Sequence, residues 1–243
     1  MTSTVTATPD VLRSVVVTGV ARAGQVGAFV AQSFAAHGAR VSIVARSISD
    51  AIARAEDMRS RGLDVHPFAC DLADPAATAA LARDVIAGAG RVDALVNAAG
   101  GFSLSGAVGE SDPAILAHQL SINLSTAYAT TRAFLPALRA SRGAVVFVAS
   151  AAALPSARVK NISAYAIAKG GVITLMRAVA QEEHASGVRS NAIAPGTIRT
   201  PENVAKLQPD TRFVEPASVA STIEFLCSPA AAQLTGQVIE LSP

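Results

Sequence analysis

A tyrosine and a lysine stand four residues apart in Tyr165-Ala-Ile-Ala-Lys169, a spacing that places both side chains on one face of a helix. A phenol with a pKa near 10 is a poor acid–base group at neutral pH, and lowering that pKa by about 3 units takes roughly 4 kcal/mol. A neighbouring ammonium group in a water-poor cleft acts in that direction. The pair therefore indicates proton-transfer chemistry, although Tyr/Lys pairs are also common on helix surfaces.

Polar residues also follow or interrupt apolar segments elsewhere. Ser150 ends the apolar segment Ala144–Ser150, where its hydroxyl can bind a substrate carbonyl and the alkoxide that develops from it. Asn97-Ala98-Ala99-Gly100 ends the preceding apolar segment. Asn123 falls inside a predicted helix, where asparagine is disfavoured unless it has a polar task such as holding a water molecule.

A glycine-rich segment, Thr18-Gly19-Val-Ala-Arg22-Ala-Gly24-Gln25-Val26-Gly27, joins the first apolar segment to a helix expected from about Gly24 to His37. Glycines permit a tight turn and let the backbone approach a pyrophosphate at the N-terminus of the helix. A plain strand-to-helix connection is the alternative. The position between a first strand and a long first helix favours a dinucleotide site.

The end of the second predicted strand indicates which dinucleotide is bound. A carboxylate there would bind the ribose 2′-hydroxyl of NAD, but Ala45 is followed by Arg46. Arg46 can bind a 2′-phosphate through two hydrogen bonds, and Arg22 adds a second positive charge. We predict NADP(H) in preference to NAD(H); the alternative is a solvated Arg46. Asp71, in Cys70-Asp71-Leu72, either accepts a hydrogen bond from the adenine amino group or caps the next turn.

Short β-branched segments alternate with helical patterns along the whole chain. Several segments are apolar at successive positions, which is typical of strands covered by helices on both faces. Aspartate–proline pairs predict helix starts at Pro75 and Pro113; the second helix is expected to reach about Arg139, with Pro136 ending or kinking it. The predicted strands are Ser14–Thr18, Arg40–Ala45, Asp64–Ala69, Val92–Asn97, Ala144–Ser150, Val188–Ala194 and Gln237–Leu241.

This alternation predicts an α/β fold: a single-domain, Rossmann-like, doubly wound parallel sheet of about seven strands flanked by helices. The ligand is expected at the carboxyl ends of the strands. A length of 243 residues suits one domain. We expect that domain to span residues 11–243 and to follow a flexible tail of residues 1–10.

Composition narrows the function classes. The chain is 51% hydrophobic and only 16% charged, which excludes disordered and collagen-like proteins. A net charge of +2 without blocks of like charge disfavours a nucleic-acid partner, and the longest apolar run is too short to span a membrane. Cys70 and Cys227 make neither a disulfide framework nor a metal cluster, so a reducing, cytoplasmic setting without a metal is expected.

Taken jointly and in order, these motifs resemble the short-chain dehydrogenase/reductase family over nearly the whole chain, and Pro195-Gly196-x-x-x-Thr200 completes the pattern. The resemblance implies that Tyr165 is the general acid/base, that Lys169 binds the nicotinamide ribose and lowers the tyrosine pKa, that Ser150 orients the carbonyl, and that Asn123 anchors a proton-relay water. The implied cofactor-contacting residues are Thr18, Gly19, Arg22, Gly24, Gln25, Val26, Gly27, Arg46, Asp71, Leu72, Asn97, Ala98, Ala99, Gly100, Tyr165, Lys169, Pro195, Gly196, Ile198 and Thr200.

Relatives of this kind commonly form homodimers or homotetramers, through helices that match those beginning at Pro113 and near Tyr165. Alanines of the first helix, Ala127, Ala129 and Ala133, would permit close approach of a partner helix, or would pack internally. No partner other than a further copy and a small-molecule carbonyl or alcohol substrate is expected.

Two of the places where the chain departs from the family pattern bear on the type of reaction. Its glycine-rich turn is longer, with Gln25 where a middle glycine would fall, and the segment between Thr200 and a helix near Glu215 is short. The longer turn is similar to that of enoyl reductases, and the short segment is similar to that of dihydropteridine reductase. The leading hypothesis is an NADP(H)-dependent oxidoreductase acting on a carbonyl or secondary alcohol; the alternatives are a C=N or C=C reductase and a non-catalytic nucleotide-sensing module.

Substrate specificity is expected to come from three loops. Arg158 and Lys160, within the second of them, face either an acidic substrate or solvent. The loops are Gly101–Glu110, Ala151–Ala164 and Ile198–Phe213.

Overall fold

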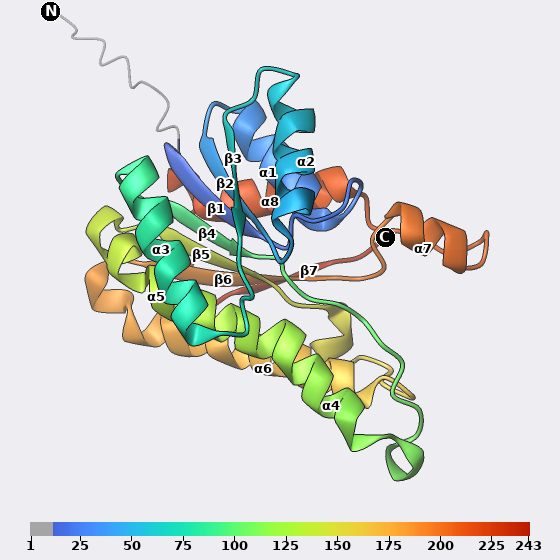
Figure 1. Ribbon diagram of the computed structural model, residues 1–243. Coiled ribbons are helices and arrows are strands. Elements are labelled where there is room, and N and C mark those ends of the chain that lie inside the picture. The colour runs from blue at the N-terminus through green and yellow to red at the C-terminus, as the bar shows by residue number, and fades with distance from the viewer. Residues whose placement is uncertain (1–11) are drawn as a thin grey trace, which may run out of the picture.

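The computed structural model describes residues 12–243, and within that range the strands form one seven-stranded parallel sheet in the order β3-β2-β1-β4-β5-β6-β7 (Figure 1). The predicted fold class is confirmed, and each predicted strand boundary lies within two residues of the observed one. The tail predicted for residues 1–10 lies outside the described residues. The strands are β1 Ser14–Thr18, β2 Arg40–Ala45, β3 Val65–Ala69, β4 Ala94–Asn97, β5 Ala144–Val148, β6 Arg189–Pro195 and β7 Val238–Leu241.

Helices cover both faces of the sheet (Figure 1). In β1, Val15 and Val17 join one core cluster with α1, α2 and α8, whereas Val16 joins the opposite cluster with α3, α5 and α6. This two-sided burial explains the uninterrupted apolar strands. The helices are α1 Val26–Ala36, α2 Ile48–Arg59, α3 Pro75–Ala89, α4 Pro113–Gln119, α5 Thr126–Ser141, α6 Ser163–Glu182, α7 Pro201–Lys206 and α8 Pro216–Cys227.

The two predicted aspartate–proline helix starts are confirmed. The Asp74 carboxylate accepts hydrogen bonds from the backbone N–H groups of Ala76 (2.7 Å) and Ala77 (3.3 Å) at the start of α3. Asp112 accepts one from Ala114 (2.8 Å) at the start of α4. Each carboxylate satisfies backbone donors that have no partner within the helix.

The helix predicted from Pro113 to about Arg139 is interrupted and longer. A π-helical segment, Leu120–Ser125, separates α4 from α5, and α5 continues to Ser141. Pro136 lies inside α5 and does not end it. The side chain of Pro136 is exposed, as is that of Arg132 one turn earlier. The backbone carbonyl that proline leaves without a partner is therefore on the side of the helix that water reaches.

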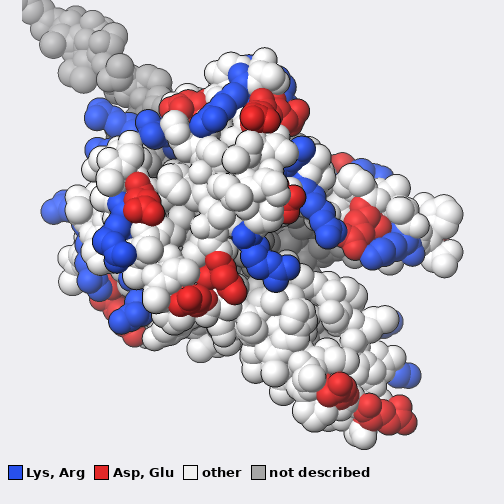
Figure 2. Space-filling model, in the orientation of Figure 1, with Lys and Arg blue, Asp and Glu red and all other residues white. Residues whose placement is uncertain are grey.

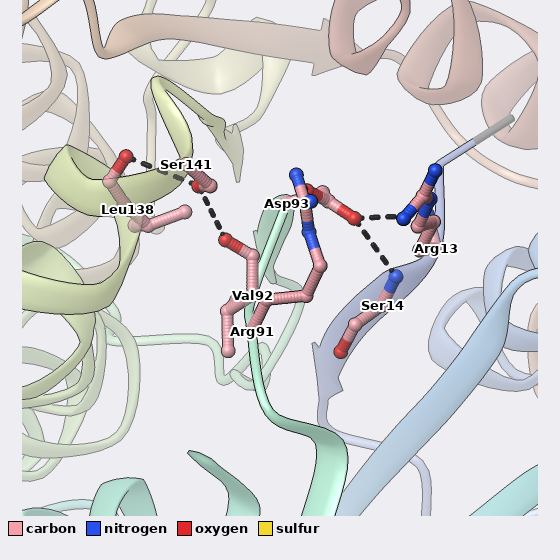
Figure 3. Close-up of polar contacts among 7 residues, drawn as sticks. All are labelled: Arg13, Ser14, Arg91, Val92, Asp93, Leu138 and Ser141. Carbon is pink, nitrogen blue, oxygen red and sulfur yellow. Dashed lines mark hydrogen bonds and ion pairs between the residues drawn. The ribbon is translucent and has the colours of Figure 1, made fainter. Parts of the chain in front are cut away.

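The amino edge of the sheet is fastened by Asp93 (Figure 3). Its Oδ2 accepts hydrogen bonds from the backbone N–H groups of Arg13 (2.9 Å) and Ser14 (3.0 Å), and its Oδ1 accepts from the guanidinium of Arg91. Ser141, at the end of α5, donates to the Val92 carbonyl (2.6 Å). These contacts join β1, β4 and α5 at the end of the sheet opposite the predicted site.

Charged and sulfur-containing groups of residues 12–243 form no metal-ligand cluster. Cys70 and Cys227 are both buried and unpaired with each other. Burial raises the pKa of the Cys70 thiol to about 11 and that of Cys227 to about 12, so both stay protonated at neutral pH. No helix in the described part of the chain combines the length and apolarity needed to cross a membrane.

A short arm carries α7 away from the sheet after β6. Its two ends are joined at the base, where the Val214 N–H donates to the Thr197 carbonyl (2.8 Å) and the Arg199 N–H donates to the Val214 carbonyl (2.9 Å). The following helix, α8, begins at Pro216, close to its predicted start. The arm is therefore brief, as expected, and holds one helix of six residues.

Candidate active site

The predicted site residues gather at the carboxyl edge of the sheet, where β1, β4, β5 and β6 end at Thr18, Asn97, Val148 and Pro195. Two arms project from this edge, one carrying α7 and the other α4 (Figure 1). Figure 2 shows the molecule hollowed between them. This position agrees with the general rule that parallel sheets bind ligands beyond the carboxyl ends of their strands.

The Lys169 ammonium lies buried at the floor of this edge, with 6% of the residue exposed. Its Nζ donates to the Val148 carbonyl at the end of β5 (2.8 Å) and lies 5.9 Å from the centroid of the Tyr165 ring. Burial lowers the pKa of Lys169 to about 8, because the charged form loses hydration. The predicted arrangement of the pair on one helical face is confirmed.

The Tyr165 phenol does not have the lowered pKa that the sequence predicts. Burial raises its pKa, and the side chain of Ser150 acts in the opposite direction as a hydrogen-bonding partner. Lys169 contributes no resolved effect on this pKa. The physical reason is that Lys169, with a pKa lowered to about 8, loses its own charge before the phenol ionises. In this structure, therefore, Tyr165 is a neutral phenol at neutral pH.

Ser150 connects the end of β5 to the segment that leads to α6. Its Oγ accepts a hydrogen bond from the Ala152 N–H (3.2 Å) and so caps the short helix Ala151–Ala153. The hydroxyl proton is not used by that contact. Ser150 and Tyr165 are thus close neighbours that both present hydroxyl groups, as carbonyl polarisation requires.

Asn123 lies in the π-helical segment and fastens the loop after β4. Its Nδ2 donates to the carbonyl of Gly101 (3.0 Å) and to the backbone and side-chain oxygens of Gln119 (both 3.1 Å), while its Oδ1 accepts from the Gly101 N–H (3.2 Å). The expected water-binding role is therefore not open to the donors of this amide, which are already used. The buried amide instead explains how asparagine is tolerated within a helix.

The depressed pKa of Lys169 predicts a pH-dependent stability. Because the folded pKa (about 8) lies below the unfolded value of 10.5, the unfolded chain binds more protons between these values, and the cost of burying the charge disappears as pH rises. We expect the unfolding free energy of the wild type to rise by about 2 kcal/mol relative to that of Lys169→Met from pH 7.5 to 9.5.

Urea unfolding of both proteins at several pH values measures this difference. The buried thiols of Cys70 and Cys227 titrate in the opposite direction, but they are present in both proteins and cancel. A difference that is the same at pH 7.5 and pH 9.5 would show that the Lys169 pKa is not depressed.

The glycine-rich turn is built for close backbone contacts. Gly19 has a φ of +76°, and a Cβ added there would lie 2.7 Å from Ala99 Cα; a Cβ added at Gly27 would lie 2.6 Å from the Gly19 carbonyl oxygen. The turn therefore folds tightly against the end of β4 and the start of α1. Such a side-chain-free cradle at a helix N-terminus fits a pyrophosphate. Gln25 is the N-cap of α1 and makes no side-chain cap bond.

The arm with α7 touches this turn. A Cβ added at Gly24, where φ is +72°, would lie 2.8 Å from Pro201 Cγ. The pKa of the Glu202 carboxyl is lowered, mainly by its ion pair with Lys206 and to a smaller extent by Arg22 and Gln25. Arg22 thus lies near Glu202 of the arm, a neighbour that the sequence did not indicate.

The residues predicted to select the dinucleotide lie where the second and third strands end. Arg46 directly follows β2 and is exposed, and among the described residues it has no ion-pair partner. Asp71 is exposed, and its Oδ1 accepts from the Ala73 N–H (3.0 Å), so the structure contains the turn cap of the two alternatives. Leu72 is 7% exposed and belongs to the core, so its side chain does not face a cofactor.

Several predicted cofactor residues use their side chains inside the protein. Thr18 Oγ1 accepts from the N–H groups of Ala98 and Ala99 (both 3.1 Å), and Asn97 Nδ2 donates to Thr131 Oγ1 (2.9 Å) on α5. Any contact of Thr18 or Asn97 with a cofactor is thus left to the backbone. Three other predicted cofactor residues are partly buried against the protein core. Val26 and Ala98 pack against the core cluster on one face of the sheet, and Ala99 packs against the cluster on the other face.

Two further groups lie as predicted at the same edge. Gly100 is exposed, and its Cα lies beside Lys169, because a Cβ added there would be 3.4 Å from Nζ. Thr200 is buried and caps α7 by accepting from the Asn203 N–H (3.3 Å). The segment after β6 includes Pro195, Gly196, whose N–H donates to the Leu241 carbonyl (2.9 Å), and Ile198, which forms a bridge with Val214.

The sequence analysis missed Phe102. Its ring meets the Tyr165 ring edge to face, with centroids 5.1 Å apart and an interplanar angle of 81°. Phe102 is 59% exposed although it touches the proposed acid. Its position was a usable signal, because the chain has only eight phenylalanines and one follows Gly100-Gly101 directly.

The alanines expected to admit a partner helix face inward. Ala127 is 5% exposed and Ala129 8%, and Ala133 packs against the core cluster that contains α3 and α6 residues. They therefore permit close packing inside the subunit. Arg158 and Lys160 are exposed on their loop, which favours solvent over an acidic substrate.

Comparison with known proteins identifies the family of this chain. Residues 19–242 match the family model described as enoyl-(acyl carrier protein) reductase. An uncharacterized oxidoreductase of Mycobacterium tuberculosis is 34% identical over 93% of this chain and 89% of its own length. D-threitol dehydrogenase of Mycolicibacterium smegmatis is 34% identical over 90% of this chain and 87% of its own length.

A solved structure of a short-chain dehydrogenase/reductase from Burkholderia xenovorans superimposes with a TM-score of 0.84 at 33% identity, covering 95% of this chain and 94% of the other. The chain belongs to the short-chain dehydrogenase/reductase family, a family of oxidoreductases. The sequence-based resemblance is thereby confirmed.

Proposed function

We propose that the protein is an NADP(H)-dependent oxidoreductase that interconverts a carbonyl and a secondary alcohol. The observation that carries this proposal is the meeting of Ser150, Tyr165 and Lys169 at the carboxyl edge of the sheet, beside a glycine cradle. A neutral phenol next to a second hydroxyl suits a carbonyl oxygen that must be held and then protonated.

When bound, a nicotinamide cofactor supplies or accepts the hydride. In the reductive direction, Tyr165 donates its hydroxyl proton to the carbonyl oxygen, and Ser150 donates a hydrogen bond to the same oxygen. The buried Lys169, held by the Val148 carbonyl, stabilises the phenolate that remains. Gly19, Gly24 and Gly27 would hold the pyrophosphate through backbone contacts, and Arg46 and Arg22 would face the 2′-phosphate.

Spectrophotometry of purified protein tests the function. NADPH absorbance is followed with ketones, aldehydes and 3-oxoacyl thioesters, and NADP⁺ reduction with secondary alcohols. Turnover of at least one carbonyl substrate is expected. Tight NADPH binding in calorimetry without turnover across the panel would instead favour a nucleotide-sensing module.

A second candidate is reduction of a C=C or C=N bond. It is favoured by the description of the matching family model and by the extended glycine-rich turn, in which Gln25 precedes Val26-Gly27. A 2-enoyl thioester and a quinonoid dihydropteridine added to the same panel decide between the candidates. Activity on these substrates with none on carbonyls would replace the leading proposal.

The choice of NADP(H) predicts the effect of Arg46→Ala. A hydrogen bond between charged groups contributes about 1.5–3 kcal/mol, so we expect the Kd for NADPH to rise about 10- to 100-fold while the Kd for NADH stays nearly constant. Calorimetric titration with each cofactor measures both values. Arg61→Ala is the control, because Arg61 lies beyond the far end of α2 and pairs with Asp57 (3.1 Å).

Equal weakening of NADPH and NADH binding by Arg46→Ala would contradict recognition of the 2′-phosphate. Tighter binding of NADH than NADPH by the wild type would do so independently of the variant.

Homodimers or homotetramers remain part of the proposal. The outward side chains Tyr128 on α5 (58% exposed) and Ile167 on α6 (55% exposed) support contacts through these two helices, although the inward alanines do not take part. Sedimentation equilibrium at micromolar concentration tests the oligomeric state, and a monomer at that concentration would contradict the proposed homodimer or homotetramer. The cytoplasmic setting likewise stays a prediction.

A further inference from the structure

The loop after β4 places an aromatic ring beside the proposed reaction site, and hydrogen bonds hold the loop backbone on both sides of that ring. Phe102 is 59% exposed yet lies edge to face against Tyr165, 5.1 Å between ring centroids. The residue before it, Gly101, is fixed by Asn123 through both of its backbone polar groups. Ser105 on the other side is fixed by Asn161 through its backbone N–H (2.8 Å). The ring is therefore held in place at both ends of a short segment.

The buried hydroxyl group of this loop, that of Ser105, is used within the protein. The Ser105 hydroxyl lies within hydrogen-bonding distance of the Asn161 carbonyl and the Ser163 hydroxyl (both 3.2 Å). Next to it the loop exposes two large apolar side chains, Phe102 and Leu104 (66% exposed), with the half-buried Ser103 between them. Exposed apolar side chains that cluster beside a reacting group are typical of a ligand-binding groove.

The arm with α7 has the same character. Glu202 and Lys206 pair with each other (2.6 Å), and Asn203 donates to the Ile198 carbonyl (2.8 Å). Val204 and Leu207 remain exposed, at 51% and 43%. Helix α7 thus also presents apolar side chains, while its own Glu202, Lys206 and Asn203 are paired.

Exposed apolar residues are concentrated on the loops that surround the site. Of the thirteen large exposed hydrophobic residues in the described part of the chain, six lie on the three loops 101–110, 151–164 and 198–213. In Figure 2 much of the visible surface of the arm that carries α4 is uncharged, with acidic side chains at its tip and basic ones at its right-hand edge. The six residues are Phe102, Leu104, Val108, Val159, Val204 and Leu207.

We propose that Phe102 is a specificity-determining residue that selects carbonyl substrates bearing an aryl or branched alkyl group and disfavours polyhydroxylated ones. The inference rests on the proposed carbonyl–alcohol function. A phenyl group on the substrate would pack against the Phe102 ring, as aromatic pairs do. A sugar alcohol would instead need a hydrogen-bonding partner for each hydroxyl that it buries, and beside Tyr165 the loop provides a phenyl ring.

Three ketones of different character test the proposal: acetophenone, butanone and the hydroxylated ketone erythrulose, each with NADPH. For the wild type we expect kcat/KM for acetophenone to exceed that for butanone about tenfold or more, and that for erythrulose to be lower still. Phe102→Ala should reduce the acetophenone-to-butanone ratio about tenfold, mainly through KM, whereas Phe102→Leu should retain most of it. Phe225→Ala, which removes another exposed phenyl group (46%) on α8, should leave the ratio unchanged.

Ligand-observed NMR of acetophenone and butanone binding to the NADP⁺ complex provides a readout that does not need turnover. Acetophenone binding should weaken in Phe102→Ala and butanone binding should not. A ratio unaffected by Phe102→Ala, or a wild-type preference for erythrulose, would overturn the inference. Absence of turnover for every ketone would overturn the proposed function, while the NMR comparison would still decide the role of Phe102.

Discussion

Tyr165→Phe is expected to lower turnover about a thousandfold, the middle of the range for loss of a positioned acid–base group. The variant lacks only the hydroxyl oxygen, so the ring contact with Phe102 can persist. Because the Tyr165 pKa is raised by burial, the wild-type phenol is protonated at neutral pH and ready to donate. The affinity for NADPH should change by no more than about twofold. The reason is that removal of a single hydroxyl oxygen leaves the glycine-rich turn, which is proposed to hold the pyrophosphate, intact.

Single-turnover and steady-state rates, together with calorimetric NADPH titration, measure these two effects. Tyr128→Phe is a matched control, because Tyr128 is the other tyrosine of the chain and lies 58% exposed on α5. Unchanged turnover of Tyr165→Phe would eliminate this phenol as the acid. A parallel loss of NADPH binding would instead indicate a structural role.

Gly27→Ala should damage both the fold and the nucleotide site. The added Cβ would lie 2.6 Å from the Gly19 carbonyl oxygen and 3.2 Å from that of Thr18, and neither backbone group can move without shifting the turn. Overpacking of this kind costs about 1–3 kcal/mol. Since the same turn forms the proposed pyrophosphate cradle, NADPH affinity should fall about tenfold or more.

Urea unfolding and NADPH titration of the folded variant measure the two losses separately. Gly88→Ala in α3 is the control, because a Cβ there meets only the Arg40 guanidinium at 3.8 Å; it should stabilise the protein by about 0.5–1 kcal/mol through helix propensity. Wild-type stability and NADPH affinity in Gly27→Ala would show that the turn is more open than described.

The strands and helix starts could be predicted from the sequence, because each depends on residues that are close together along the chain. Uninterrupted valines gave β1 its two-sided burial, and the carboxylates of Asp74 and Asp112 bind N–H groups only two residues on. The joint order of Ser150, Tyr165 and Lys169 placed three candidate groups at one sheet edge for the same reason: parallel strands share that edge.

Contacts between distant segments were not predictable in this way. Three such contacts depend on how separate elements pack. They are the hydrogen bond from Lys169 to the Val148 carbonyl, the hydrogen bond from Asn97 to Thr131 on α5, and the close approach of Pro201 to Gly24. The prediction that the Tyr165 pKa is lowered was wrong for a related reason. Spacing indicated which cation lay nearby, but only the folded geometry shows that burial sets the direction of the shift.

The opposite placement of the two ends of the described chain affects how the protein is best handled. Residue 12 leads into β1 at the edge fastened by Asp93, whereas β7 delivers Leu241 to the carboxyl edge, where it bonds Gly196. Figure 1 places the end marked C beside α7. A fusion partner or affinity tag joined after Pro243 would therefore crowd the mouth of the reaction cleft, and immobilisation through the other end leaves that mouth facing the solution.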